Sequence, residues 1–255
     1  MQEALTTFTL SNGSIQALYL KREGPLMVMI HGFPGRPQDF KRLIEQLDGC
    51  SILAIALPGF GLSPSRPNLN YAQLVQSITE LIAHIGPESL YLLGHSFGGA
   101  LAVTVASEVK CDIKGLFLIS SVGLRPHRAM RNGARYLYPI ISYTPLYWLR
   151  KSIVPPLFRS AGFPAKLSFE AMWLSCQLAW EFDFKAHAQI LSRITVPCFI
   201  VHSKDDPLVE TQIVHELGEQ LPKAESILLD SGGHNPHYHH TETVVDLIHS
   251  KMLGR

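Results

Sequence analysis

The chain has 255 residues, of which 46% are hydrophobic and 17% charged, and its formal net charge is +1. This length and composition fit one globular domain with a large core, with or without an insertion, and they exclude a disordered chain. Because the charge is near neutral and no run of five basic residues occurs, we expect no nucleic-acid partner.

We expect no targeting or membrane-spanning segment in this sequence. Met1-Gln2-Glu3-Ala4 lacks the basic and apolar parts of a secretory signal, and no apolar run approaches the ~18 residues of a spanning helix. We therefore expect a cytoplasmic protein without membrane contact, although a mature secreted chain would look the same. The four cysteines, at positions 50, 111, 176 and 198, have no metal-ligand spacing. They are predicted to be buried free thiols, and the alternative is that two of them form one disulfide.

The first half of the chain alternates strand-like and helix-like segments. Apolar or alternating runs predict strands at 6–10, 15–20, 26–30, 51–57, 89–93 and 115–120. Ser11-Asn12-Gly13 predicts a hairpin turn between the first two. Apolar residues at helical spacing predict helices at 39–47, 71–85 and 100–109. This alternation indicates a parallel sheet with helices on both faces.

The pattern changes after Ser121. Residues 123–184 contain helix-like stretches cut by six prolines and no buried strand. The alternation then resumes with helices predicted at 187–194, 212–221 and 242–252 and strands at 198–202 and 226–229. We predict an α/β core formed by residues 1–122 and 185–255, with a helical cap, or lid, inserted at 123–184.

A serine stands at the turn after the strand that ends near Leu93. Gly94-His95-Ser96-Phe97-Gly98 matches the G-x-S-x-G pattern of a nucleophile elbow, in which a strand turns sharply into a helix. Ser96 is expected in a strained backbone conformation at the helix N-terminus, where N–H groups favour negative charge. Gly94 and Gly98 are expected where a Cβ would collide with a neighbouring element. An ordinary glycine-rich turn is the alternative.

Five segments in chain order resemble the serine-type α/β-hydrolases, and in particular their cap-bearing, esterase- or lipase-like members. They are His31–Gly35, Pro58–Ser63, Gly94–Gly99, Lys204–Val209 and Gly232–Asn235. The resemblance covers nearly the whole chain. It implies the α/β-hydrolase fold, with a mostly parallel eight-stranded sheet flanked by helices and an inserted helical cap.

A catalytic triad follows from the chain order of this fold, which is nucleophile, acid and histidine. Ser96 is predicted to attack a carbonyl, His234 to act as general base and then general acid, and Asp206 to orient the imidazole. Asp205 is the alternative acid. The resemblance favours Asp206 because it directly precedes Pro207, and it leaves Asp205 as a turn residue.

Two backbone N–H groups are expected to form the oxyanion hole. One is that of Phe97, directly after the nucleophile, and the other is that of Phe33, since Pro34 has no N–H. His31 and His95 are expected to be structural hydrogen-bonding residues. Four histidines follow the last strand, at positions 234, 237, 239 and 240, but their spacing fits no zinc signature. Apart from His234 we expect them at the surface, and we predict no metal and no organic cofactor.

The predicted cap is rich in aromatic residues and contains all three tryptophans. We expect an apolar substrate pocket there, lined by Trp148, Trp173, Trp180, Tyr143 and Phe169. Packing of the cap on the core is the alternative role for these side chains. A lid at a membrane interface over 136–158 is disfavoured by four prolines and by the Arg150-Lys151 pair.

The nucleophile narrows the expected function. Related enzymes that open epoxides or remove halide have aspartate where this chain has Ser96, and many carbon–carbon hydrolases have tryptophan where it has Asn235. The sequence therefore predicts a carboxylic ester hydrolase that acts on small to medium apolar acyl esters through an acyl-enzyme, with a small-molecule ester as its partner. A carbon–carbon bond hydrolase of ring-fission products, a thioesterase, a cofactor-free haloperoxidase and a catalytically silent ligand binder stay open. The oligomeric state is not predicted.

Overall fold

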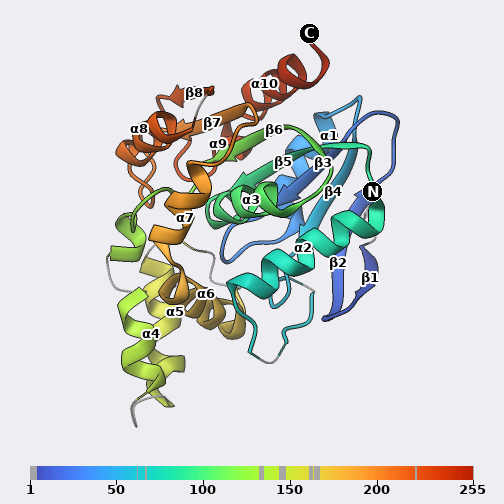
Figure 1. Ribbon diagram of the computed structural model, residues 1–255. Helices are drawn as coiled ribbons and strands as arrows, with labels where there is room; N and C mark the ends of the chain where they lie inside the picture. The colour runs from blue at the N-terminus through green and yellow to red at the C-terminus, as the bar shows by residue number, and fades with distance from the viewer. Residues whose placement is uncertain are drawn as a thin grey trace.

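One eight-stranded sheet runs through the protein, with the strand order β1-β2-β4-β3-β5-β6-β7-β8 (Figure 1). The computed structural model describes residues 5–61, 63–66, 68–131, 135–143, 148–160, 163, 167–221 and 223–254. The strands are β1 (Thr6–Leu10), β2 (Gly13–Leu20), β3 (Leu26–Ile30), β4 (Ser51–Ala56), β5 (Ser89–His95), β6 (Asp112–Ile119), β7 (Cys198–Ser203) and β8 (Ala224–Leu229).

The sheet is parallel except at one end. β1 and β2 form the predicted antiparallel hairpin, and β2 is also antiparallel to β4, whereas all other neighbours are parallel. The mostly parallel eight-stranded sheet that the sequence predicts is confirmed.

Helices join successive strands of the parallel part. A 3-10 helix, η1 (Pro37–Phe40), leads into the first α-helix. The α-helices are α1 (Lys41–Gln46), α2 (Tyr71–Ile85), α3 (Phe97–Glu108), α4 (Arg135–Ser142), α5 (Arg150–Ser160), α6 (Phe169–Glu181), α7 (Phe184–Leu191), α8 (Thr211–Gln220), α9 (Pro236–His239) and α10 (Thr241–Leu253).

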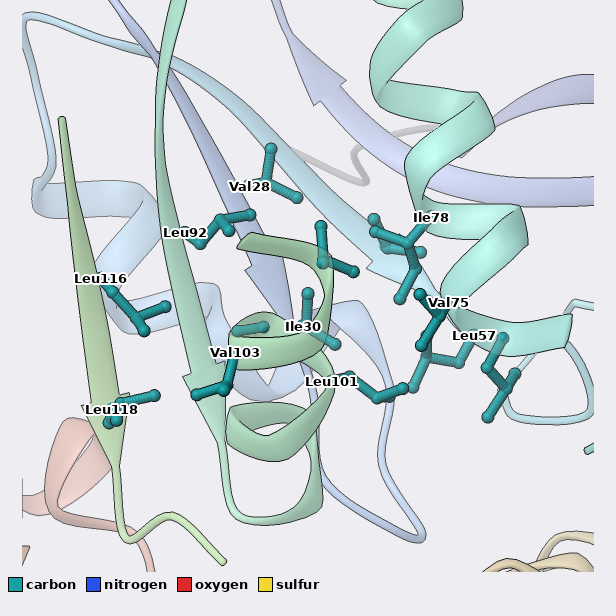
Figure 2. Packing of buried hydrophobic residues seen from close by; sticks show 14 of the residues in the cluster. Val28, Ile30, Leu57, Val75, Ile78, Leu92, Leu101, Val103, Leu116 and Leu118 are labelled. Carbon is teal, nitrogen blue, oxygen red and sulfur yellow. The ribbon is translucent and has the colours of Figure 1, made fainter. Parts of the chain in front are cut away.

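Strand β3 is buried on both faces, and its alternating side chains serve two cores. Val28 and Ile30 belong to the cluster that packs under α2 and α3, where Figure 2 shows them with residues of β5 and β6. Met27 and Met29 belong to the second cluster, which includes side chains of α1 and α10. The sheet is therefore the middle layer of three.

Helix α2 begins and ends where its sequence directs. The Asn70 side chain accepts a hydrogen bond from the Gln73 backbone N–H, while the Gln73 side chain accepts from the Asn70 backbone, which together form a capping box. At the other end Gly86 has φ 65° and ψ 47°, the left-handed conformation that glycine adopts without a Cβ clash. The predicted bounds of this helix match the observed ones.

Helices α4 to α7 lie between β6 and β7, and α4, α5 and α6 lie together at the lower left of Figure 1. The expectation that prolines cut this region is wrong for the prolines at 139, 155 and 156, because α4 and α5 continue through them. Proline has a helical φ, although it removes one N–H donor and its ring crowds the carbonyl of the residue four before it. Burial of Val154 and Phe158 against α6 supports α5 instead. The prolines at 145 and 164 fall outside the described residues.

All four cysteines are free thiols as predicted, and three of them are buried. No helix in the described ranges has the length and apolar character needed to cross a membrane.

Candidate active site

Ser96 is the single residue between the end of β5 and the start of α3. Its φ of 53° and ψ of −122° are unusual for a residue with a side chain, so the predicted strained turn is confirmed. A Cβ on Gly94 would lie 2.3 Å from the Gly98 carbonyl oxygen, and one on Gly98 would lie 2.2 Å from the Ile30 oxygen. Only glycine therefore permits this close approach of α3 to the sheet.

Asp206 and His234 form a direct hydrogen bond at the carboxyl edge of the sheet. His234 Nδ1 lies 2.8 Å from Asp206 Oδ2, and Asp206 Oδ1 accepts from the backbone N–H groups of Leu208 (2.8 Å) and Val209 (3.0 Å). Burial alone would raise the pKa of Asp206, but the hydrogen bond and charge of His234 and the two N–H donors outweigh it, and the pKa lies below its ordinary value. An ionised carboxylate only accepts, so Nδ1 of His234 carries a proton and donates to Asp206.

Ser96 and His234 both line one cavity, so the structure brings the three predicted triad residues together. Within the described residues, no hydrogen bond joins the Ser96 hydroxyl to the imidazole. In enzymes without substrate this contact is often long and shortens when substrate binds.

Asp205 contacts the histidine loop rather than the imidazole. Its Oδ1 accepts from Gly233 N–H (2.8 Å) and its Oδ2 from Gly232 N–H (3.3 Å). These glycines have φ of 57° and 127° and directly precede His234. Asp205 thus fixes the backbone that carries His234, a wider role than that of the turn residue expected from the sequence.

Aromatic stacking holds together the loops that carry the two expected oxyanion donors. The rings of Phe33 and Phe97 stack with centroids 4.4 Å apart, and Phe60, from the loop after β4, stacks on Phe33 at 4.7 Å. Phe97 is the first residue of α3, where backbone N–H groups lack helical partners. Neither Phe33 N–H nor Phe97 N–H donates to another described residue. A Cβ on Gly32 would lie 2.8 Å from Ser96 Cβ, so the Phe33 loop lies directly against the serine.

Two buried histidines hold backbone around the site, as expected. His31 Nδ1–H donates to the Gly32 carbonyl (2.8 Å), and its Nε2 accepts from Leu57 N–H (3.2 Å). His95 Nε2–H donates to the His234 carbonyl (2.8 Å). Burial lowers the pKa of His31 to about 4 and that of His95 well below its usual range. Both are neutral at physiological pH.

The expectation of surface histidines after the last strand is wrong for His237. This side chain is buried, with its ring centroid 4.6 Å from that of His95 and 5.5 Å from that of Phe40. The sequence also gave no sign of His202, which is fully buried with Nδ1 3.9 Å from Asp206 Oδ2. The described part of the chain contains no group of three His, Cys, Asp or Glu residues that could hold a metal ion.

The cavity at Ser96 is small, about 80 Å³, and mostly apolar. It is lined by Phe33, Ser96, Phe97, His127, Ala129, Met130, Phe158, Phe163, Ser175, Cys176, Ala179, Leu208 and His234. Three of these, Ser175, Cys176 and Ala179, lie on one face of α6. The sequence analysis missed that face, although its position in the insertion and its small side chains were visible signals.

The five aromatic residues predicted to form the substrate pocket do not line this cavity and require a correction. Tyr143 and Trp148 are 79% and 67% exposed. Trp173 packs on Tyr138 (4.9 Å between centroids) and Phe169 (6.3 Å) and so joins α4 to α6. Trp180 is 37% exposed. These side chains pack inserted helices together or face solvent, so they follow neither the predicted pocket nor the alternative of packing on the core.

Residues 27–247 match the family model described as "Alpha/beta hydrolase family", and the chain belongs to this family of hydrolases. It is 27% identical to Lipase 1 of Psychrobacter immobilis over 84% of this chain and 72% of that protein. It is 23% identical to Lipase 3 of Moraxella sp. strain TA144 over 90% and 78%. Among solved structures it is similar to an esterase from Exiguobacterium antarcticum, with a TM-score of 0.80 and 18% identity over 97% and 98%. The last comparison supports the fold alone.

Proposed function

We propose that this chain is a carboxylic ester hydrolase that acts on small to medium apolar acyl esters. The observation that carries the proposal is the hydrogen-bonded Asp206–His234 pair, with His234 and Ser96 at the wall of one apolar cavity. The similarity to two lipases supports an ester as the substrate.

The proposed reaction has two halves. Ser96 Oγ bonds to the ester carbonyl carbon while its proton moves to His234 Nε2. The oxyanion accepts hydrogen bonds from the backbone N–H groups of Phe33 and Phe97. The C–O bond of the alcohol then breaks, and the alcohol leaves with the proton from His234. Water repeats these steps on the acyl-enzyme and releases the acid and the Ser96 hydroxyl.

Asp206 supports both halves in the same way. Its carboxylate holds the imidazole in the Nδ1–H tautomer and stabilises the cation that forms when Nε2 takes a proton. Because the pKa of Asp206 lies below its ordinary value, the group stays ionised throughout the neutral range.

We also propose that residues 123–184 act as a cap on the substrate. Ser175, Cys176 and Ala179 of α6 share a cavity with Ser96, so this helix covers the side from which an ester reaches the serine. The small volume of the cavity favours short chains.

A fluorophosphonate probe, which reacts with an activated serine, tests the proposal. We expect the wild type to be labelled and Ser96→Ala to be unlabelled. On p-nitrophenyl butyrate, Ser96→Ala and His234→Ala should each lower kcat by on the order of 10⁴–10⁶. A loss below tenfold in a folded variant contradicts the mechanism. A matched thioester and a ring-fission dienone serve as comparison substrates, and faster turnover of either would overturn the ester assignment.

A further inference from the structure

The polar side chains of the cavity, apart from the catalytic pair, are His127 and Ser175. Both are buried, with exposed fractions of 7% and 6%. The proposed ester hydrolysis assigns no role to either. Their hydrogen bonds show what kind of group each of them offers to a ligand.

His127 offers an acceptor. Its Nδ1 lies 3.0 Å from the Leu208 carbonyl oxygen, which can only accept, so the ring proton is on Nδ1. Burial, followed by the nearby charge of His234, lowers the pKa of His127 to about 4, so the ring is neutral at physiological pH. Nε2 then carries a lone pair. No described residue hydrogen-bonds to Nε2, and the His127 side chain lines the cavity.

The ring cannot easily turn away, because its chain segment is tied to the loop that follows Asp206. The Leu208 carbonyl also accepts from Ala129 N–H (3.1 Å), and Arg128 N–H donates to Glu210 Oε2 (2.7 Å). The Arg131 guanidinium donates to the same glutamate. Rotation of the imidazole would break its own bond inside this fixed frame.

Ser175 adds a second acceptor. Its hydroxyl donates to the Ala171 carbonyl of the preceding helical turn (2.7 Å), so only the oxygen lone pairs remain for a ligand. Apart from Ser96 and the Cys176 thiol, the polar side chains of the cavity wall therefore offer acceptors to a ligand. An alkyl chain placed here would leave a buried acceptor unpaired, whereas a ligand hydroxyl would satisfy it.

His127 lies close to the Asp206–His234 pair. It interacts electrostatically with His234 and Asp206 and is bonded to the loop that carries Asp206. His234 is the group that returns a proton to the departing alcohol. A hydroxyl that reaches His127 therefore belongs to the alcohol part of the ester.

We propose that this cavity selects esters whose alcohol part carries a second, free hydroxyl group, and that this hydroxyl donates to Nε2 of His127. The substrate class is thus a monoester of a diol or polyol. This inference rests on the proposed ester hydrolysis and specifies its substrate.

Two esters of equal size test the inference: 2-hydroxyethyl butanoate and n-propyl butanoate. We expect the wild-type kcat/KM to be at least about tenfold higher for the hydroxyethyl ester. In His127→Phe the ratio should fall to within about twofold of one. Leu208 keeps its bond from Ala129 in this variant, and His127→Gln, which restores an acceptor, should recover part of the ratio.

His187→Phe is the matched control, because His187 is as buried as His127 but does not line the cavity. Its ratio should equal that of the wild type. A wild-type ratio near one, a ratio that persists in His127→Phe, or turnover of neither ester overturns the inference. A preference seen only for a hydroxyl on the acyl part overturns it as well. Because fluorophosphonate labelling of Ser96 is measured in parallel, these outcomes are distinguished from failure of the proposed hydrolysis.

Discussion

Asp205 and Asp206 are neighbours in the chain, yet each supports His234 in a different way. Asp206 bonds the imidazole, whereas Asp205 bonds the backbone of the two glycines before it. The adjacent carboxylates gave the sequence analysis two candidate acids, and the resemblance alone favoured one. Only the hydrogen bonds separate their roles.

These contacts predict unequal effects of two identical substitutions. In Asp206→Asn the amide NH₂ can face His234 Nδ1, which favours the tautomer with the proton on Nε2 and removes the base, so kcat should fall by about 10⁴. Asp205→Asn keeps one acceptor oxygen for the glycine loop, and kcat should fall less than tenfold. Initial rates on p-nitrophenyl butyrate, with thermal unfolding as the check of folding, measure both. A larger loss in Asp205→Asn would reverse the assignment.

At the scale of single elements, the sequence predicted strands better than it predicted the inserted helices. The strand β3 is a continuous apolar run, and its bounds follow directly. Aromatic residues in the insertion carry no such directional information, because a ring can face a cavity, another helix or solvent. Only the packing decides: on α6 three small residues line the cavity, while Trp173 packs on Tyr138 of α4 and Trp180 is partly exposed.

The residues of α6 that line the cavity lead to a prediction about the length of the acyl chain that the enzyme accepts. Ala179→Leu adds carbon atoms to the wall of a small cavity on a helix that tolerates leucine well. We expect kcat/KM for p-nitrophenyl hexanoate to fall about tenfold or more, while that for the acetate changes less than threefold. Trp180→Leu, the neighbouring position outside the cavity, should leave the ratio of the two rates unchanged. An equal effect of both variants would contradict the assigned lining.

At the scale of the whole molecule, the sequence predicted which residues meet at the candidate site because the fold fixes the order of its parts. Ser96, Asp206 and His234 follow different strands, and a parallel sheet brings the ends of those strands to one edge. The neutral histidines around this edge could not be predicted in the same way. His237 looks like a surface residue in the sequence, and its burial depends on packing against Phe40 and His95 from distant parts of the chain.

Six buried histidines have a lowered pKa: His31, His95, His127, His187, His202 and His237. Burial is the largest cause for each. In the unfolded chain their pKa returns to about 6.5, so below that pH the unfolded state binds more protons than the folded state. Their contribution to stability is complete above pH 6.5 and is lost as the pH falls toward the folded pKa. For His31, His127 and His187 that pKa is about 4.

We therefore predict a steep loss of stability in mild acid. Below the unfolded pKa, each histidine that stays neutral in the folded state lowers the free energy of unfolding by about 1.4 kcal/mol for every unit by which the pH falls. Six such histidines together lower it by up to about 8 kcal/mol per unit. Since domains are typically stable by only about 5–15 kcal/mol, unfolding should occur near pH 5. Urea unfolding at pH 7.5, 6.5 and 5.5 measures the slope. His187→Phe should reduce this slope by about 1.4 kcal/mol per unit, and a flat profile would mean that the fold accommodates these imidazoles as cations.

The lowered pKa values of Asp206 and Glu210 act only below about pH 4.5, where unfolded carboxylates take up protons, so they do not contribute in this window.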